Sequence, residues 1–182
     1  RRARRAHARL NGIIEGLVAD RRRAPRERGA QLSMLLEARD EDGATMTDRQ
    51  VRDEAMTILL AGHETTANAL TWTWYLLSEH PGAERTLHAE IDAVLQGRLP
   101  ELADLPALSG VERVVTESMR LYPPAWAIGR RAIGPYAVGG NLAPARTIML
   151  MSPWLMHRDG RFFPEPARFN PERWTPAFRA AL

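Results

Sequence analysis

Residues 61–66, Ala-Gly-His-Glu-Thr-Thr, combine small side chains with groups that handle protons. Glycine and β-branched threonine both weaken a helix, so their presence inside a long helical segment needs a further reason. Ala61 and Thr65 share a helix face, and the small residues around Gly62 would let a flat ligand approach the backbone. A tight helix–helix crossing would use the same residues. The carboxylate of Glu64 beside the hydroxyl of Thr65 favours a ligand, because the two groups suit a proton relay.

Two other catalytic motifs begin in this sequence but are not completed. His63-Glu64 could open the HExxH motif of a metalloprotease, but position 67 is Ala, so the second histidine ligand is missing. His157-Arg158-Asp159 is similar to the start of a kinase catalytic loop, but the Asn expected downstream is replaced by Pro164. The sequence has no glycine-rich phosphate loop. Neither motif is therefore complete in this sequence.

Glu117 and Arg120 stand three residues apart, which places them on one helix face. An isolated pair of this kind is usually exposed and contributes only about 0.2–1 kcal/mol. Here the pair runs directly into Leu-Tyr-Pro-Pro at 121–124. It also lies about fifty residues after Ala-Gly-His-Glu-Thr-Thr and about fifty before Pro-Glu-Arg-Trp at 171–174. The order of these segments carries more information than any one of them.

Hydrophobic periodicity predicts that helices position most of these residues. A capping box at Thr47 and Gln50 indicates a helix start, and no Gly-Pro stop follows until 80–82. That spacing predicts one helix of about thirty residues around the 61–66 segment. Pro25 and Gly29 should break the first helix. The predicted helices are 1–24, 31–39, 47–79, 81–96 and 110–121.

The character of the sequence changes after residue 122, because nine of the thirteen prolines lie in 123–182. Short extended pieces replace the helical pattern, and Gly139-Gly140 predicts a turn between two of them. The predicted strands are 128–133, 136–138 and 147–151. The sequence therefore predicts a mainly α protein with a small β-sheet.

Composition limits the possible functions further. The 182 residues fit one domain, and their 45% hydrophobic content supports a packed core. The absence of cysteine excludes disulfides, thiolate metal sites and cysteine nucleophiles within these residues. All 25 basic residues are Arg, and residues 1–28 carry a local charge of +7. That segment could bind nucleic acid or an anionic membrane, but it lacks interleaved aromatic residues, which favours a solvated helix face.

Taken together, the segments at 61–66, 117–120, 121–124 and 169–174 resemble part of the cytochrome P450 family, the haem-thiolate monooxygenases. The resemblance covers residues 47 to about 174. It implies a partial P450 fold, with a long central helix, an ExxR helix, a small sheet and a meander. On this interpretation residues 1–182 form one incomplete haem-monooxygenase domain, which is helical over 1–122 and rich in strands and loops over 123–182.

The resemblance also implies roles for individual residues. Glu64 and Thr65 would be catalytic and assist proton delivery during oxygen activation. The residues expected to contact haem are Ala61, Gly62, Thr65 and Arg130, the last through a propionate. The substrate pocket would include Ala61, Ala125, Trp126, Ala127 and Ile128, and a structural salt-bridge network would join Glu117, Arg120 and Arg173.

Haem and an NAD(P)H electron source are the cofactors that the resemblance implies. The partners would be an apolar small-molecule substrate and a redox partner, either a ferredoxin or flavodoxin-type protein or a reductase. Nucleic acid and a membrane span are not expected, and the predicted location is a bacterial cytoplasm. The cysteine loop of the family is expected beyond Leu182, so the chain should contain no axial metal ligand and should be inactive alone.

Overall fold

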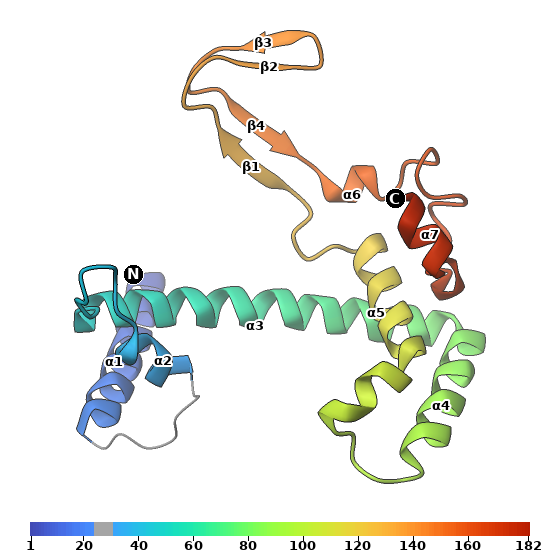
Figure 1. Cartoon of the computed structure of the whole chain (residues 1–182), viewed down its shortest axis with the longest axis horizontal. Helices are drawn as coiled ribbons and strands as arrows, with labels where there is room; N and C mark the ends of the chain where they lie inside the picture. The colour runs from blue at the N-terminus through green and yellow to red at the C-terminus, as the bar shows by residue number, and fades with distance from the viewer. Residues whose placement is uncertain (24–30) are drawn as a thin grey trace. The chain divides into compact units, whose positions relative to one another are not determined.

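The computed structural model describes residues 1–23 and 31–182 (Figure 1). They divide into two compact units, Arg1–Glu64 and Thr65–Leu182. The helix break predicted at Pro25 and Gly29 lies outside the described residues. In the described part of the chain, no helix is both long enough and apolar enough to cross a membrane.

The first unit contains α1 (Arg2–Arg23), α2 (Gln31–Glu37) and the beginning of α3 (Asp48–Glu79). Two apolar residues of α1, Ile13 and Leu17, are 52% and 54% exposed. The side of α1 that is buried packs against α3 through a small cluster. Its buried members are Ile14, Val18, Val51 and Met56.

The long helix α3 has 32 residues, which corresponds to about 48 Å at 1.5 Å per residue. The predicted capping box is confirmed. The Gln50 N–H donates to Thr47 Oγ1 at 3.3 Å, and the Thr47 N–H donates to Gln50 Oε1 at 2.9 Å. Threonines inside the helix satisfy their hydroxyls locally, as Thr71 does by donating to the Ala67 carbonyl at 2.7 Å. These local bonds allow a Thr-rich segment to stay helical.

The second unit begins within α3 and continues through α4 (Pro81–Leu95), the 3-10 helix η1 (Leu102–Ala107) and α5 (Ser109–Leu121). The Glu90 carboxylate of α4 caps the start of α5, because it accepts the Gly110 N–H at 2.7 Å and the Val111 N–H at 3.2 Å. The core of this unit lies between the end of α3, α5 and the C-terminal segment. Its buried members are Leu76, Leu77, Val114, Leu121 and Phe169.

The β structure consists of two separate antiparallel pairs in place of the single small sheet that was expected. Strand β1 (Ile128–Arg131) pairs with β4 (Ile148–Met151), and β2 (Tyr136–Val138) pairs with β3 (Asn141–Ala143). The turn predicted at Gly139-Gly140 is confirmed, and both glycines have positive φ angles, 55° and 76°. The sequence analysis assigned no strand to residues 141–143, which form β3 on the far side of this turn.

Three short helices close the chain, and the sequence analysis did not predict any of them. They are α6 (Pro153–Met156), the 3-10 helix η2 (Pro171–Arg173) and α7 (Pro176–Ala181). Each begins with proline at its first position, after a residue whose side chain accepts a backbone N–H of the first turn. The capping residues, each followed directly by proline, are Ser152, Asn170 and Thr175, so the signal was present in the sequence.

Candidate functional site

The Glu117 carboxylate is the centre of a buried ionic network in the second unit. Its side chain is fully buried, and that of Arg120 is only 1% exposed. Arg120 binds the carboxylate in bidentate fashion, through Nε to Oε2 and Nη2 to Oε1, both at 2.9 Å. Arg173 adds a second guanidinium, because its Nε donates to Oε1 at 3.0 Å. Two cations therefore share one carboxylate away from solvent.

Two further donors complete the coordination of Glu117. The Asn170 backbone N–H donates to Oε1 at 2.9 Å, and the Trp174 indole Nε1–H donates to Oε2 at 3.0 Å. The sequence analysis did not assign Trp174 to the network. An aromatic residue directly after Arg173 was visible in the sequence, but only the structure shows that its N–H reaches Glu117.

The two arginines also bind the backbone of the segment that leads into η2. Arg120 Nη1 donates to the His157 carbonyl at 2.7 Å and to the Pro166 carbonyl at 2.7 Å. Arg173 Nη1 donates to the Pro164 carbonyl at 2.7 Å. Because residues 157–170 have little regular structure, these bonds replace the backbone pairing that a helix or strand would supply.

His157 and Arg120 contact each other in two ways. Its ring Nδ1 lies 3.2 Å from the Arg120 carbonyl oxygen, while its own carbonyl accepts from Arg120. Burial lowers the pKa of the His157 imidazole; the hydrogen bond to the Arg120 carbonyl opposes this shift, and the positive charges of Arg120 and Arg158 add to it. The neutral imidazole is therefore favoured more strongly here than in an exposed histidine.

Four of the residues predicted to act on haem and oxygen lie on α3 and are exposed, namely Ala61, Gly62, Glu64 and Thr65. Glu64 and Thr65 are adjacent, so their side chains diverge by about 100° around the helix. A side chain at Gly62 would meet no atom within 4 Å. Gly62 also lines a cavity of about 490 Å³ in the first unit. This part of α3 is therefore open to a closely approaching ligand.

Arg130 lies on β1, where its guanidinium is exposed and its Nη1 donates to the Gly129 carbonyl at 2.9 Å. The structure does not bring Arg130 into the Glu117 network. Of the residues predicted for a substrate pocket, Trp126 lines a cavity of about 210 Å³, and its carbonyl accepts a hydrogen bond from Ser152 Oγ at 3.0 Å. Ala125 and Ala127 lie in the same loop as Trp126, and Ile128 is the first residue of β1.

The sequence analysis also missed an aromatic contact that borders this cavity. The rings of Trp72 and Tyr122 stack with centroids 4.0 Å apart and planes 6° apart. The Arg158 guanidinium lies 5.7 Å from the Tyr122 ring centre and 4.2 Å from that of Trp154. The end of α5 is thereby fixed against α3 just before the loop that carries Trp126.

Comparison with known proteins identifies the relatives of this chain. The family model described as Cytochrome P450 matches residues 1–180. Cyclooctatin synthase of Streptomyces melanosporofaciens is 47% identical over 173 residues, which cover 94% of this chain and 38% of that protein. Cyclooctat-9-en-7-ol 5-monooxygenase of the same organism is 44% identical, covering 96% of this chain and 38% of that protein. Pentalenene oxygenase of Streptomyces avermitilis is 40% identical, covering 95% and 38%.

Solved structures agree with these matches. A crystal structure of a cytochrome P450, CYP102L1, superposes with a TM-score of 0.89 at 27% identity, over 100% of this chain and 43% of that one. The retinoic acid-bound cyanobacterial CYP120A1 gives a TM-score of 0.90 at 27% identity, over 95% of this chain and 40% of that one. The chain thus spans about 38% of the length of the curated relatives named above.

Proposed function

Because this chain belongs to the cytochrome P450 family, we propose that the protein containing it is a haem-dependent monooxygenase. The proposed reaction uses two electrons and two protons to place one atom of O₂ in an apolar organic substrate and release the other as water. The observation that carries the proposal is the acid–hydroxyl pair, Glu64 and Thr65, on an open part of α3, in a chain that matches the family over nearly its whole length.

In this proposal Gly62 and Arg130 each contribute one contact to haem. The backbone at Gly62 can be approached closely, because a side chain there would meet no atom within 4 Å. The exposed guanidinium of Arg130 suits a propionate, to which it can donate two parallel hydrogen bonds. When bound, the haem would supply the binding and reduction of O₂, which side chains cannot perform.

An axial thiolate would have to come from outside these residues. The sequence contains no cysteine. Across residues 1–23 and 31–182, no group of three or more His, Cys, Asp or Glu side chains is placed to hold a metal ion. In this proposal the chain therefore supplies the proton path, one propionate contact and structural support, and the 182 residues alone are inactive.

The proposed proton path runs through Glu64 and Thr65. A carboxyl group can take up a proton from solvent, and a hydroxyl can accept one hydrogen bond while it donates another. Thr65 would hold a proton donor in place toward the reacting oxygen, and Glu64 would restore the proton. Ala61 would leave room beside them for the substrate.

The remaining residues would position substrate and scaffold. The small and apolar side chains of Ala125, Trp126, Ala127 and Ile128 suit the wall of an apolar substrate site. The buried network around Glu117 would hold the segment after residue 157 rigidly against α5. Electrons would come from NAD(P)H through a ferredoxin, a flavodoxin-type protein or a reductase. The named relatives are from Streptomyces, and we propose a bacterial cytoplasmic location.

The test uses the whole protein that contains this chain, purified with haem. The reduced carbon monoxide complex should show the red-shifted absorption typical of thiolate ligation. With isotopically labelled O₂ and a reconstituted electron supply, one labelled oxygen atom should enter each product molecule. Failure to bind haem, or product whose oxygen derives from water, would contradict the proposal.

A further inference from the structure

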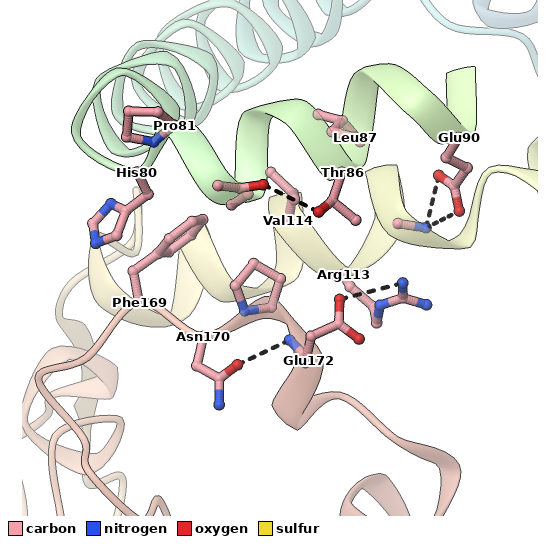
Figure 2. Close-up of a pocket in the computed structure, with 14 residues that line it drawn as sticks. His80, Pro81, Thr86, Leu87, Glu90, Arg113, Val114, Phe169, Asn170 and Glu172 are labelled. Carbon is pink, nitrogen blue, oxygen red and sulfur yellow. Dashed lines mark hydrogen bonds and ion pairs between the residues drawn. The ribbon is translucent and has the colours of Figure 1, made fainter. Parts of the chain in front are cut away.

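A pocket in the second unit shares no lining residue with α3 residues 61–65 or with the predicted substrate loop at 125–128. Figure 2 shows it between α4, α5 and the segment that leads into η2. Its volume is about 380 Å³, within the range of roughly 300–1,000 Å³ that is typical of small-molecule sites. The apolar side chains of Leu87, Val114 and Phe169 form part of its lining.

Most polar groups that line this pocket are engaged by the protein itself. Glu90 caps the N-terminus of α5 through the Gly110 N–H. The Thr86 hydroxyl donates to the Gly82 carbonyl at 3.1 Å. The Asn170 side-chain oxygen accepts the Glu172 N–H at 3.2 Å. A ligand would therefore find few of these groups available without breaking an existing contact.

Arg113 is the exception, because its guanidinium is only partly satisfied. Its Nε is buried and has no hydrogen-bond partner in the described structure. Its Nη1 donates to the Ser109 hydroxyl at 3.1 Å. Its only ion pair in the described structure is a long one, from Nη2 to Glu172 Oε1 at 3.5 Å, and the Glu172 side chain is 71% exposed (Figure 2). Because this ion pair is long, an anion better placed at the guanidinium would be favoured.

We propose that this pocket binds a small ligand with a carboxylate on an apolar body. The carboxylate displaces Glu172 from Arg113 and makes a charge-assisted pair, while the apolar body contacts Leu87, Val114 and Phe169. Glu172 can leave at little cost, because its carboxylate is mostly exposed to water. The site lies outside the residues proposed to act in oxygen activation.

A ligand in this pocket would contact a segment that is hydrogen-bonded to Glu117. Phe169, Asn170 and Glu172 line the pocket, and the Asn170 backbone N–H is bound to Glu117 Oε1 at 2.9 Å. A ligand that contacts this segment would therefore reduce its motion together with that of the network. We expect bound carboxylate to raise the thermal stability of the protein by mass action.

The probe for this site is 4-phenylbutyrate, and its neutral analogue 4-phenylbutan-1-ol serves as the matched control ligand. Calorimetry on the purified whole protein should show saturable binding of the carboxylate, with the alcohol roughly tenfold weaker because it lacks the charge. Arg113→Gln should weaken carboxylate binding by roughly the same factor. Glu172→Gln should tighten it, because the competing carboxylate is removed.

The opposite signs of these two variants distinguish the pocket from any other site that takes up phenylbutyrate, including the proposed substrate site. Arg85→Gln is the matched control, because Arg85 is exposed on α4 and does not line the pocket. Thr86→Trp should fill the pocket and abolish phenylbutyrate binding without changing any charge. This variant therefore tests the site even if Arg113→Gln folds poorly. The proposal is wrong if phenylbutyrate does not bind saturably. It is also wrong if either Glu172→Gln or Arg85→Gln weakens phenylbutyrate binding as Arg113→Gln does.

Discussion

Glu117 receives five hydrogen bonds, four of them from the side chains of Arg120, Arg173 and Trp174 and one from the Asn170 backbone. Removing two charges from water costs several kcal/mol per ion, and their attraction offsets that cost only with good geometry and further hydrogen bonds. Both conditions are met here. The main effect of the network is therefore to fix the position of the segment after residue 157. Its net contribution to stability is the smaller effect.

Replacing Arg120 by Leu should destabilise the second unit strongly. The Glu117 carboxylate would stay buried and lose both bonds from its bidentate partner, and the typical cost of breaking a buried pair is about 3–5 kcal/mol. Urea unfolding of the whole protein should show this loss, together with a lower yield of haem-loaded material. A variant with wild-type stability and haem content would show that the pair has no structural role.

The His157 imidazole predicts a pH dependence of stability. Burial lowers its pKa below the ordinary value of 6.5, so the folded state binds this proton less tightly than the unfolded chain. The contribution of His157 is therefore fully present above about pH 6.5 and is lost as the pH falls through the lower, folded-state pKa. Asp104 and Asp159 do not obscure this range, because hydrogen bonds from Arg98 and Arg161 lower their pKa values to about 2.

The measurement is the free energy of unfolding between about pH 7.5 and pH 5, in wild type and in His157→Gln. The wild type should lose stability faster than the variant as the pH falls. Equal slopes would mean that His157 does not contribute to the pH dependence.

At the level of elements, the position of α5 depends on a contact from α4. The Glu90 carboxylate accepts the Gly110 N–H with both oxygens, at 2.7 and 2.9 Å. Because α5 carries Glu117 and Arg120, a shift at its start would be transmitted to the network through a rigid helix. Glu90 is thus a structural residue that the sequence analysis did not single out, since nothing in its local pattern distinguishes it from an exposed acid.

Gly110→Ala should be destabilising, although alanine is the better helix former. A Cβ at position 110 would lie 2.7 Å from Glu90 Oε2, so the cap would have to move. Loss of such a cap costs up to about 2 kcal/mol, and at that end of the range it exceeds the gain in helix propensity of roughly 1 kcal/mol. Gly82→Ala is the control in the same unit, because a Cβ there meets no atom within 4 Å. A Gly110 variant more stable than wild type would contradict the importance of the cap.

Element prediction from the sequence succeeded where the signal was local and long. The helix at 48–79 was predictable from its capping box and from the absence of breakers, and its observed start is one residue from the prediction. The short helices at 153–156 and 176–181 were missed, because one turn shows no periodicity. In the candidate site, the motif order identified Glu117, Arg120 and Arg173. It could not identify the bond from Trp174, which joins residues 57 positions apart.

At the scale of the whole molecule, each unit exposes apolar side chains that an independent domain would normally bury. In the first unit Leu60 is 57% exposed, and in the second Trp74 is 67% exposed. The chain covers about 38% of the length of its named relatives.

The Arg-rich N-terminal segment forms α1, which packs through Ile14 and Val18. The comparisons give no support for a role of this segment in binding nucleic acid or a membrane.

The 182-residue chain produced alone should therefore associate and should bind a dye that reports exposed apolar surface. Titrated with haem, it should not give the red-shifted carbonyl spectrum of thiolate ligation, because it has no cysteine. Absorption spectra and light scattering test both points. A monodisperse chain with a thiolate-type spectrum would contradict them.

The central claim is that the Thr65 hydroxyl directs protons during oxygen activation, and it is tested by the ratio of hydroxylated product formed to NAD(P)H consumed. Thr65→Ala should leave folding and haem content intact, because alanine is the better helix former by about half a kcal/mol. Its ratio should fall, with peroxide released in place of product. Thr66→Ala is the matched control and should stay near wild type, since Thr66 points about 100° away around α3. An unchanged ratio in Thr65→Ala, or an equal fall in both variants, would contradict the account.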